Sequence, residues 1–287
     1  MTLGPPFDPD AAAAAICAEE DLILLQPLGR GSFKQAYLVR SQASNTHALK
    51  VIRDPVPSAR TEREISSLIR CNHPSIARLV KVGSLAFEAH NVQYIIEEHL
   101  PGGTLSQRID PPGSFDEAAV LGIGGHLIDA LQHLAQLALV HRDIKPDNIM
   151  FRDDMSTPVL VDFGCVRDLS ASSLTLTWML QGPGTPYFAS PEQLNNQKLL
   201  TDWRSDQFSL GVTLYFALTQ SHPYQHPGEP VFAGDTVERV AQRGQAAPSF
   251  VKAVRETRLA PIERMVSPWP VQRFRTPAAL MAAWQIP

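Results

Sequence analysis

One short stretch of the sequence gathers the side chains that phosphate chemistry needs. The run from His141 to Asn148 reads His-Arg-Asp-Ile-Lys-Pro-Asp-Asn, and an Asp-Phe-Gly triplet begins soon afterwards at Asp162. A carboxylate such as Asp143 can orient a hydroxyl group and accept its proton, and Lys145 can neutralise charge on a phosphoryl group in transfer. The oxygens of Asn148 and Asp162 are the hard ligands that Mg²⁺ prefers. The stretch predicts a site for phosphoryl transfer to a hydroxyl group.

The stretch resembles the catalytic loop of protein kinases, H-R-D-x-K-P-x-N, and the triplet resembles the metal-binding D-F-G that follows it. The resemblance covers about Leu22 to Trp284 and is closest to Hanks-type Ser/Thr kinases; abundant alanine and arginine favour a bacterial source. It implies an α+β, bilobal fold. A small antiparallel sheet with one main helix forms an N-lobe over about 22–99, and a mostly helical C-lobe covers about 100–287. Residues 1–21 are a leader, either mobile or partly a short helix.

The composition excludes several other classes of protein. The chain has 287 residues, 44% of them hydrophobic, and a net charge of −4, so it can bury a large core and has no basic footprint for nucleic acid. Three widely spaced cysteines favour a reducing compartment. No apolar run approaches the roughly 20 residues that cross a bilayer, and residues 1–10 lack a signal-peptide pattern. We expect a cytoplasmic protein without a membrane segment in this chain, and the oligomeric state stays open.

Two glycines lie between two predicted strands, 22–28 and 35–40, where a backbone hairpin can approach phosphates closely. The kinase glycine loop reads G-x-G-x-x-G-x-V. Here the third glycine is Lys34, which either adds a cation over the phosphates or points into solvent. The resemblance implies that nucleotide-binding residues of this region are Leu28, Gly29, Arg30, Gly31, Ser32, Phe33 and Ala36.

A third predicted strand, 47–52, carries Lys50 within an apolar run. The resemblance implies that Lys50 holds the α- and β-phosphates of ATP and that Ala48 lines the same site. Such a lysine needs an acidic partner. The predicted helix 61–70 offers Glu64, which fits the family pattern R-E-I-x-x-L, with Glu62 as the alternative.

The segment from Glu97 to Leu105 contains Pro-Gly-Gly, which breaks a sheet and marks a linker between lobes. In the family this linker binds adenine, which implies contacts from the Glu98 carbonyl and from the backbone of Leu100. Met150 is assigned to the same site. Glu97 then falls where the family keeps an apolar or small residue. Either this carboxylate finds water or a cation, or the alignment is shifted by one residue.

The resemblance implies a complete mechanism. ATP lies between the lobes, Asn148 and Asp162 hold Mg²⁺ (Mn²⁺ is the alternative), and Asp143 positions a Ser or Thr hydroxyl of a protein substrate. The catalytic residues are Asp143, Lys145, Lys50 and Glu64.

Residues 165–184 form a long polar loop that corresponds to the activation segment of the family. Arg142 can pair with a phosphate on this loop and order it. Glu192 needs a buried cationic partner, for which Arg273 is the candidate, and Asp206 is expected to cap the catalytic loop or a helix start. Thr185 resembles the threonine that contacts the catalytic loop in Ser/Thr kinases. The candidate phosphoacceptors are Ser170, Ser172, Ser173, Thr175 and Thr177.

Two other functions fit the same motifs. Lys34 and Glu97 depart from the family pattern and favour a pseudokinase, a nucleotide-binding or scaffold module, whereas Lys50, Asn148 and Asp162 favour an active enzyme. A small-molecule phosphotransferase of related fold is disfavoured by the activation segment and its Glu192. We therefore expect autophosphorylating Ser/Thr kinase activity.

Overall fold

The structure is a computed structural model that describes residues 7–31, 34–52, 59–109, 115–152, 157–170 and 185–285, with only the backbone described for 59–64 and 185. The chain divides into two compact units. Unit 1 comprises Met1–Asn72 and Ala77–Leu100, and unit 2 comprises His73–Ile76 and Pro101–Pro287. The division after Leu100 falls in the segment where Pro-Gly-Gly predicted a linker.

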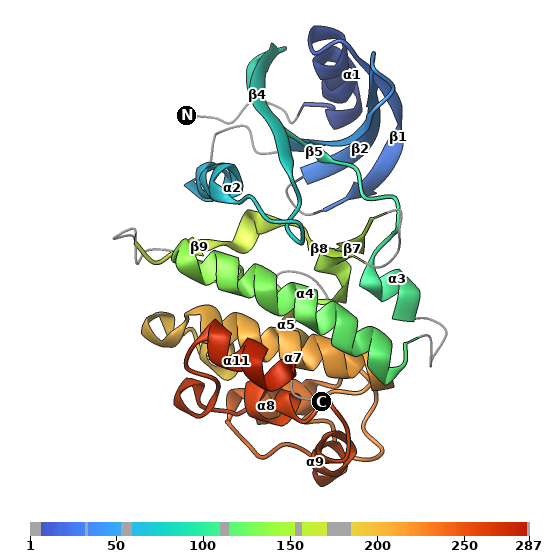
Figure 1. Ribbon diagram of the computed structural model, residues 1–287. Helices are drawn as coiled ribbons and strands as arrows, with labels where there is room; N and C mark the ends of the chain where they lie inside the picture. The colour runs from blue at the N-terminus through green and yellow to red at the C-terminus, as the bar shows by residue number, and fades with distance from the viewer. Residues whose placement is uncertain are drawn as a thin grey trace. The chain divides into compact units, whose positions relative to one another are not determined.

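Unit 1 is built on an antiparallel sheet with the strand order β1-β2-β3-β5-β4 (Figure 1). Its strands alternate side chains between two faces, as the period of two requires. The predicted third strand is extended by one residue at its start. The strands are β1 (Leu22–Arg30), β2 (Lys34–Ser41), β3 (Thr46–Ile52), β4 (Leu79–Phe87) and β5 (His90–Glu98).

The leader contains a helix, α1 (Pro9–Glu19), which packs on this sheet (Figure 1). Asp8 caps its first turn by accepting a hydrogen bond from Asp10 N, and Pro9 occupies the first helical position, where a missing N–H costs nothing. Ala12, Ala13, Ile16 and Cys17 of α1 are buried in one cluster with side chains of β2, β3 and β5. Of the two expectations for this segment, the short helix is confirmed.

The buried cluster fixes which strand positions face α1. Leu49 and Val51 of β3, and Val92, Tyr94 and Ile96 of β5, belong to it. By alternation, Ala48 and Lys50 lie on the opposite face of the sheet. The second helix of unit 1, α2 (Ala59–Arg70), includes the predicted helix 61–70.

Unit 2 is mostly helical. The long helix α4 (Glu117–Gln136) packs against α7 (Trp203–Thr219) and α11 (Pro277–Trp284). Two small antiparallel sheets have two strands each: β6 (Leu139–Val140) pairs with β9 (Arg167–Asp168), and β7 (Ile149–Phe151) pairs with β8 (Pro158–Leu160) as a hairpin. The remaining helices are α3 (Leu105–Ile109), α5 (Thr185–Phe188), α6 (Pro191–Leu194), α8 (Gly234–Ala241), α9 (Pro248–Arg255) and α10 (Pro261–Met265), with 3₁₀ turns η1 (Pro146–Asn148), η2 (Phe163–Cys165), η3 (Lys198–Leu200) and η4 (Pro270–Gln272).

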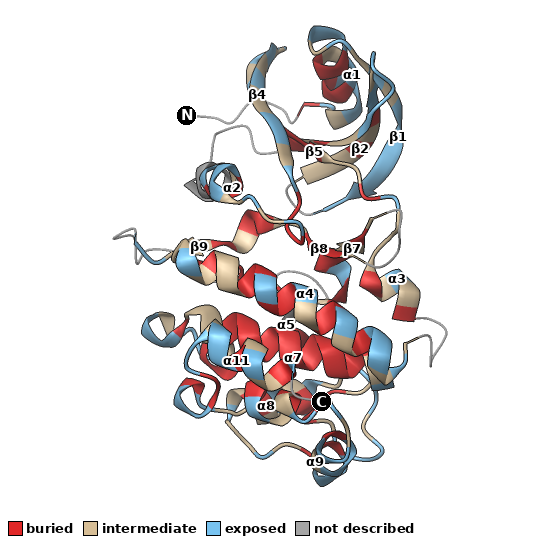
Figure 2. Cartoon of the chain, viewed as in Figure 1, coloured by how far each residue is buried: buried red, intermediate tan, exposed pale blue. Residues whose placement is uncertain are grey.

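Helix α7 is buried along most of its length and is largely red in Figure 2. A helix that is apolar on most sides belongs inside a core. The sequence predicted its start at Asp206, but the helix begins at Trp203 and its N-cap is Asp202, which accepts a hydrogen bond from Arg204 N. Asp206 therefore lies inside the helix and is available for another contact.

Gly124 of α4 packs closely against the Trp284 ring: a Cβ added at Gly124 would lie 2.1 Å from a ring carbon. The Trp284 indole N–H also donates to the carbonyl of Leu121 at 3.0 Å. In the described part of the chain, no helix has the length and apolarity needed to cross a membrane.

Candidate active site

The predicted catalytic loop follows β6, and its backbone is bound by the side chain of Asp206. The Asp206 carboxylate accepts hydrogen bonds from the backbone N–H groups of His141 and Arg142, each at 2.7 Å. Burial raises the pKa of Asp206 to about 7, and the two N–H donors oppose that shift. The expectation that Asp206 caps the catalytic loop is confirmed.

Three functional side chains converge within this loop. Lys145 Nζ lies 2.9 Å from Asp143 Oδ2, and Asn148 Nδ2 lies 2.9 Å from the same oxygen. Asn148 Nδ2 also donates to the Asp143 main-chain carbonyl at 2.8 Å. Because one amide nitrogen makes both contacts, the planar amide directs the Asn148 oxygen away from the Asp143 carboxylate. Lys145 and Asn148 thus fix the orientation of the Asp143 carboxylate, which is predicted to contact the substrate hydroxyl.

The β7–β8 hairpin brings Asn148 and Asp162 near one another. Ile149 pairs with Leu160, and Val161 N donates to the Asn148 carbonyl at 3.0 Å. Asp162 has left-handed backbone angles, φ 60° and ψ 79°, and its side chain accepts a hydrogen bond from Gly164 N. A small polar residue tolerates this conformation by bonding its own local backbone. The hairpin thus delivers both predicted metal ligands to one region of unit 2.

His141 links the loop to the Asp-Phe-Gly triplet. Its Nδ1 accepts from Asp143 N at 3.3 Å, and its Nε2 lies 3.2 Å from the Val161 carbonyl. Its ring meets the Phe163 ring edge-on, with centroids 4.9 Å apart. Burial lowers the pKa of His141, which favours the neutral imidazole that this donor and acceptor pattern requires.

Arg142 is anchored on both sides. Its Nε donates to the Cys165 carbonyl at 2.6 Å, and its own carbonyl accepts from Gln193 Nε2 at 2.8 Å. This contact of Gln193 was not predicted from the sequence. The sequence feature that could have indicated it is the Ser-Pro-Glu-Gln run, which forms a capping box. Ser190 is the N-cap of α6, and the Gln193 side chain accepts a hydrogen bond from the Ser190 backbone N–H.

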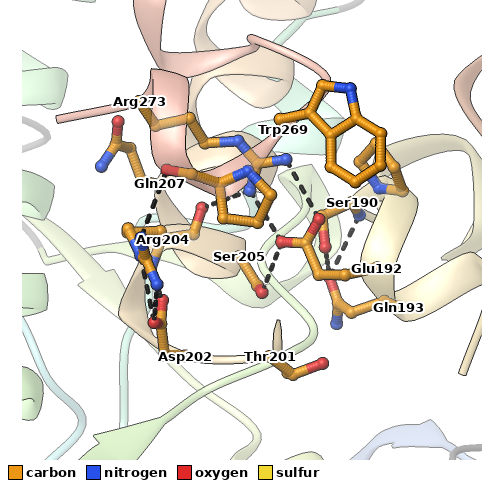
Figure 3. A network of polar contacts seen from close by, with 12 residues as sticks. Ser190, Glu192, Gln193, Thr201, Asp202, Arg204, Ser205, Gln207, Trp269 and Arg273 are labelled. Carbon is orange, nitrogen blue, oxygen red and sulfur yellow. Dashed lines mark hydrogen bonds and ion pairs between the residues drawn. The ribbon is translucent and has the colours of Figure 1, made fainter. Parts of the chain in front are cut away.

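The predicted pair of Glu192 and Arg273 is confirmed. Both side chains are fully buried, and the two guanidinium nitrogens lie 2.7 and 3.1 Å from the carboxylate oxygens (Figure 3). Burial alone would raise the pKa of Glu192, but the charge and hydrogen bonds of Arg273 and Ser205 lower it below its usual value. The segment that follows the activation loop is therefore tied to the C-terminal part of unit 2.

The predicted phosphoacceptors are mostly outside the described residues, as is the Thr185 side chain. Ser170 is described, and its hydroxyl lies 2.5 Å from Asp168 Oδ1. Among the described residues, no group of three or more His, Cys, Asp or Glu side chains has the arrangement of a metal site. The expected donor set of Asn148 and Asp162 fits a hard cation that takes further oxygens from phosphate and water.

In unit 1, Ala36, Ala48 and Lys50 share one face of the sheet. Ala36 lies opposite Lys50, and Ala48 lies two residues before Lys50 on the same strand. Leu28, Gly29 and Arg30 end β1, and Gly31 N donates to the Lys34 carbonyl at 2.8 Å. Lys34 therefore closes the strand pair through its backbone, and its side chain is half-buried. Ser32 and Phe33 lie outside the described residues.

Lys50 has an acidic neighbour within the sheet. Its Nζ lies 2.6 Å from Glu97 Oε2, and the two side chains are 15% and 3% exposed. Glu97 thus has the cation that one of the two sequence interpretations required. Glu64 lies on α2, but its side chain is outside the described residues, so its pairing with Lys50 stays a prediction.

The remaining nucleotide-site predictions are divided between the units. Glu98 ends β5 and its N–H donates to the Arg78 carbonyl at 3.0 Å, while the buried Leu100 is the last residue of unit 1. Met150 lies in β7 of unit 2, opposite Val159. Their contacts with nucleotide stay predictions.

Comparisons with known proteins identify the family. A sequence model of the protein kinase domain matches residues 22–285. A probable serine/threonine-protein kinase of Streptomyces coelicolor is 32% identical over 220 residues, covering 75% of this chain and 31% of that protein. The serine/threonine-protein kinase PknB of Mycobacterium leprae is 33% identical over 220 residues, covering 75% of this chain and 33% of that protein. PknB of Mycobacterium tuberculosis is 29% identical over 266 residues, covering 89% and 41%.

The chain therefore belongs to the protein kinase domain family, and the resemblance to bacterial Hanks-type Ser/Thr kinases is confirmed. It spans about a third of the length of the curated relatives it matches.

Proposed function

We propose that this chain transfers the γ-phosphoryl group of ATP to serine or threonine hydroxyls of protein substrates. The observation that carries the proposal is the convergence of Lys145 and Asn148 on the Asp143 carboxylate. Little covalent chemistry is needed for phosphoryl transfer, so positioning and charge stabilisation account for most of the rate. Asp143 orients the acceptor hydroxyl and accepts its proton, and Lys145 is close enough to neutralise charge on the transferring group.

Asn148 and Asp162 would hold the metal, with Mg²⁺ as the proposed ion and Mn²⁺ as the alternative. The support is chemical: an amide oxygen and a carboxylate suit a hard cation, and the β7–β8 hairpin supplies both. When bound, the cation supplies positive charge beside the phosphate oxygens.

The nucleotide would take its other contacts from unit 1. Lys50 would bind the α- and β-phosphates, and the end of β1, with Ala36 and Ala48, would contact the nucleotide from the same face of the sheet. The backbone of Glu98 and Leu100 and the side chain of Met150 would contact adenine. Because ATP and reduced thiols are maintained in the cytoplasm, we place the chain there; its cysteines are not in disulfides.

The activation segment gives the enzyme a route to regulation. Arg142 lies beside Asp143 and contacts Cys165, the residue that begins the segment. A phosphate on this segment would add charge that an arginine can bind, which orders the loop. We infer autophosphorylation at one or more of Ser170, Ser172, Ser173, Thr175 and Thr177.

Mass spectrometry of the purified chain after incubation with MgATP, together with transfer of labelled γ-phosphate to a generic protein substrate, tests the proposal. The wild type is expected to phosphorylate itself and the substrate on Ser or Thr. Asp143→Asn is expected to lower the rate by about 10²–10⁴-fold, the usual contribution of a positioned general base. The matched control is Asp235→Asn, an exposed acid in the first turn of α8, which should keep the wild-type rate.

Wild-type transfer in the Asp143→Asn variant would refute the role of Asp143. Nucleotide binding without any transfer by the wild type would instead identify a pseudokinase, and a labelled small molecule in place of labelled protein would identify a metabolite phosphotransferase.

A further inference from the structure

Lys50 is paired with a carboxylate of its own sheet. The Nζ atom of Lys50 lies 2.6 Å from Glu97 Oε2, the distance of a strong charge-assisted hydrogen bond. Glu97 is 3% exposed and Lys50 is 15% exposed, so water reaches the pair only from the lysine side. A buried carboxylate is retained only when a cation or several donors satisfy it, and here the cation is the lysine predicted to bind phosphate.

Strand register explains why the two side chains meet. In the β3–β5 pair, Ala48 lies opposite Glu97 and Lys50 lies opposite Ile95. Lys50 and Glu97 are therefore diagonal neighbours on the same face, within reach of long side chains. Ala48, directly opposite Glu97, has only a methyl group, which leaves space for the lysine stem to turn towards the carboxylate.

The position of this partner matters for how Lys50 is held. Adjacent strands are locked by a ladder of backbone hydrogen bonds, so the separation of Lys50 and Glu97 does not depend on the position of any helix. A partner on α2, such as Glu64, would hold Lys50 only while that helix stays in place. A strand-borne carboxylate keeps the ammonium in one position before any ligand binds, which is a form of preorganisation.

We propose that the Glu97 carboxylate positions Lys50 for the phosphates of ATP. Glu97 is a positioning residue: it acts through the ammonium group and does not contact the reacting atoms. This inference rests on the proposed kinase activity for its kinetic consequences, whereas the pairing itself can be measured without catalysis.

The kinetic test compares Glu97→Gln with the wild type. Glutamine keeps the size of the side chain and removes its charge. We expect Glu97→Gln to lower kcat/KM for ATP by about tenfold or more, the factor for one lost charge-assisted hydrogen bond, with much of the change in KM for ATP. The KM for the protein substrate should not change, because Glu97 acts only on the nucleotide side.

Two further variants serve as an alternative substitution and a control. Glu97→Met removes the carboxylate without leaving a buried polar group, so it provides the same comparison if the glutamine variant folds poorly. Glu88→Gln alters an exposed acid in the β4–β5 turn of the same unit and should behave as wild type. A wild-type kcat/KM for ATP in both Glu97→Gln and Glu97→Met would overturn the proposal.

A labelling experiment tests the pair without ATP turnover. An ammonium group that is hydrogen-bonded to a carboxylate in a largely buried site is shielded from an amine-directed acylating reagent. We expect mass spectrometry to show faster acylation of Lys50 in Glu97→Gln and Glu97→Met than in wild type, with no change in Glu88→Gln. Equal acylation of Lys50 in the wild type and the Glu97 variants would refute the pairing even if the wild type is an active kinase. Faster acylation in an enzyme that transfers no phosphate would instead support the pairing and refute the proposed function.

Discussion

The buried pair of Glu192 and Arg273 offers the clearest test of what holds unit 2 together. Both side chains have zero exposure, and the carboxylate also accepts a hydrogen bond from Ser205 Oγ at 2.7 Å. The guanidinium donates further to the carbonyls of Ser267 and Arg204, each at 2.8 Å. Replacing Glu192 by glutamine keeps the volume but removes the charge, and it turns an amide NH₂ or a neutral oxygen towards a buried cation.

Removing one partner of such a pair costs about 3–5 kcal/mol, because the other charge is left buried and uncompensated. The carbonyl acceptors of Arg273 remain in the variant and continue to solvate the guanidinium. We therefore expect Glu192→Gln to lower the free energy of unfolding by about 3 kcal/mol, the lower end of that range. For a unit of this size, each kcal/mol lowers the melting temperature by about 2–4 °C, so the expected shift is about 6–12 °C.

Thermal unfolding followed by circular dichroism at pH 7 measures this shift. The matched control is the exposed pair of Arg255 and Glu263, which has similar two-point contacts of 2.6 and 2.7 Å. Its side chains are 65% and 33% exposed, so Glu263→Gln should lower the melting temperature by less than about 2 °C. The double variant Glu192→Leu/Arg273→Met leaves no buried charge and should recover much of the loss seen in Glu192→Gln.

The pH dependence follows from the lowered pKa of Glu192. Burial raises this pKa, Arg273 and Ser205 lower it, and the net result is below the ordinary value of 4.5. The stabilisation is therefore complete above about pH 4.5 and declines as the pH falls through the folded-state pKa, so the wild type should approach Glu192→Gln in acid. A melting-temperature difference below 2 °C between wild type and Glu192→Gln at pH 7, or a double variant no more stable than Glu192→Gln, would refute this account of the pair.

Two other predictions concern stability. Burial lowers the pKa of His222 from 6.5 to about 3, so between these pH values His222 is protonated in the unfolded chain and neutral in the folded chain. The stability that this group contributes is fully present above pH 6.5, and it falls by about 1.4 kcal/mol per pH unit below that value. The variant His222→Asn retains an acceptor for Tyr224 N. In denaturant titrations, its free energy of unfolding should therefore lie closer to that of the wild type at pH 5 than at pH 7. Ile16 of α1 is fully buried, so Ile16→Ala should cost about 2–5 kcal/mol in the unfolding of unit 1, whereas a value near zero would show that α1 is not part of that core.

The sequence predicted the parts of the site that lie close together along the chain. Asp143, Lys145 and Asn148 are within one loop, and local backbone geometry is enough to make them converge. The Glu192 and Arg273 pair was also predictable, because a buried acid demands a cation and the family pattern offered one.

The sequence could not decide contacts that depend on register and packing. The neighbour of Lys50 is set by which residue of β5 lies opposite Ala48, and no pattern within β3 reveals that pairing. The reason for Gly124 is the ring of Trp284, which lies far away along the chain. The α1 segment has alanines that favour a helix, but only the folded sheet shows that its small side chains fit a buried face.

One turn of α7 explains how the catalytic loop keeps its geometry. Three consecutive residues near its start bind three separate segments: Ser205 donates to Glu192, Asp206 accepts from the catalytic loop, and Gln207 exchanges hydrogen bonds with the backbone of Phe274. Consecutive helical residues point about 100° apart, so a single turn can contact elements on several sides. All three side chains are buried, where an unmatched polar group is costly, so each contact resists displacement. The catalytic loop is thus fixed to the most buried helix of unit 2, and a change at Asp206 would alter the placement of Asp143 without touching any substrate.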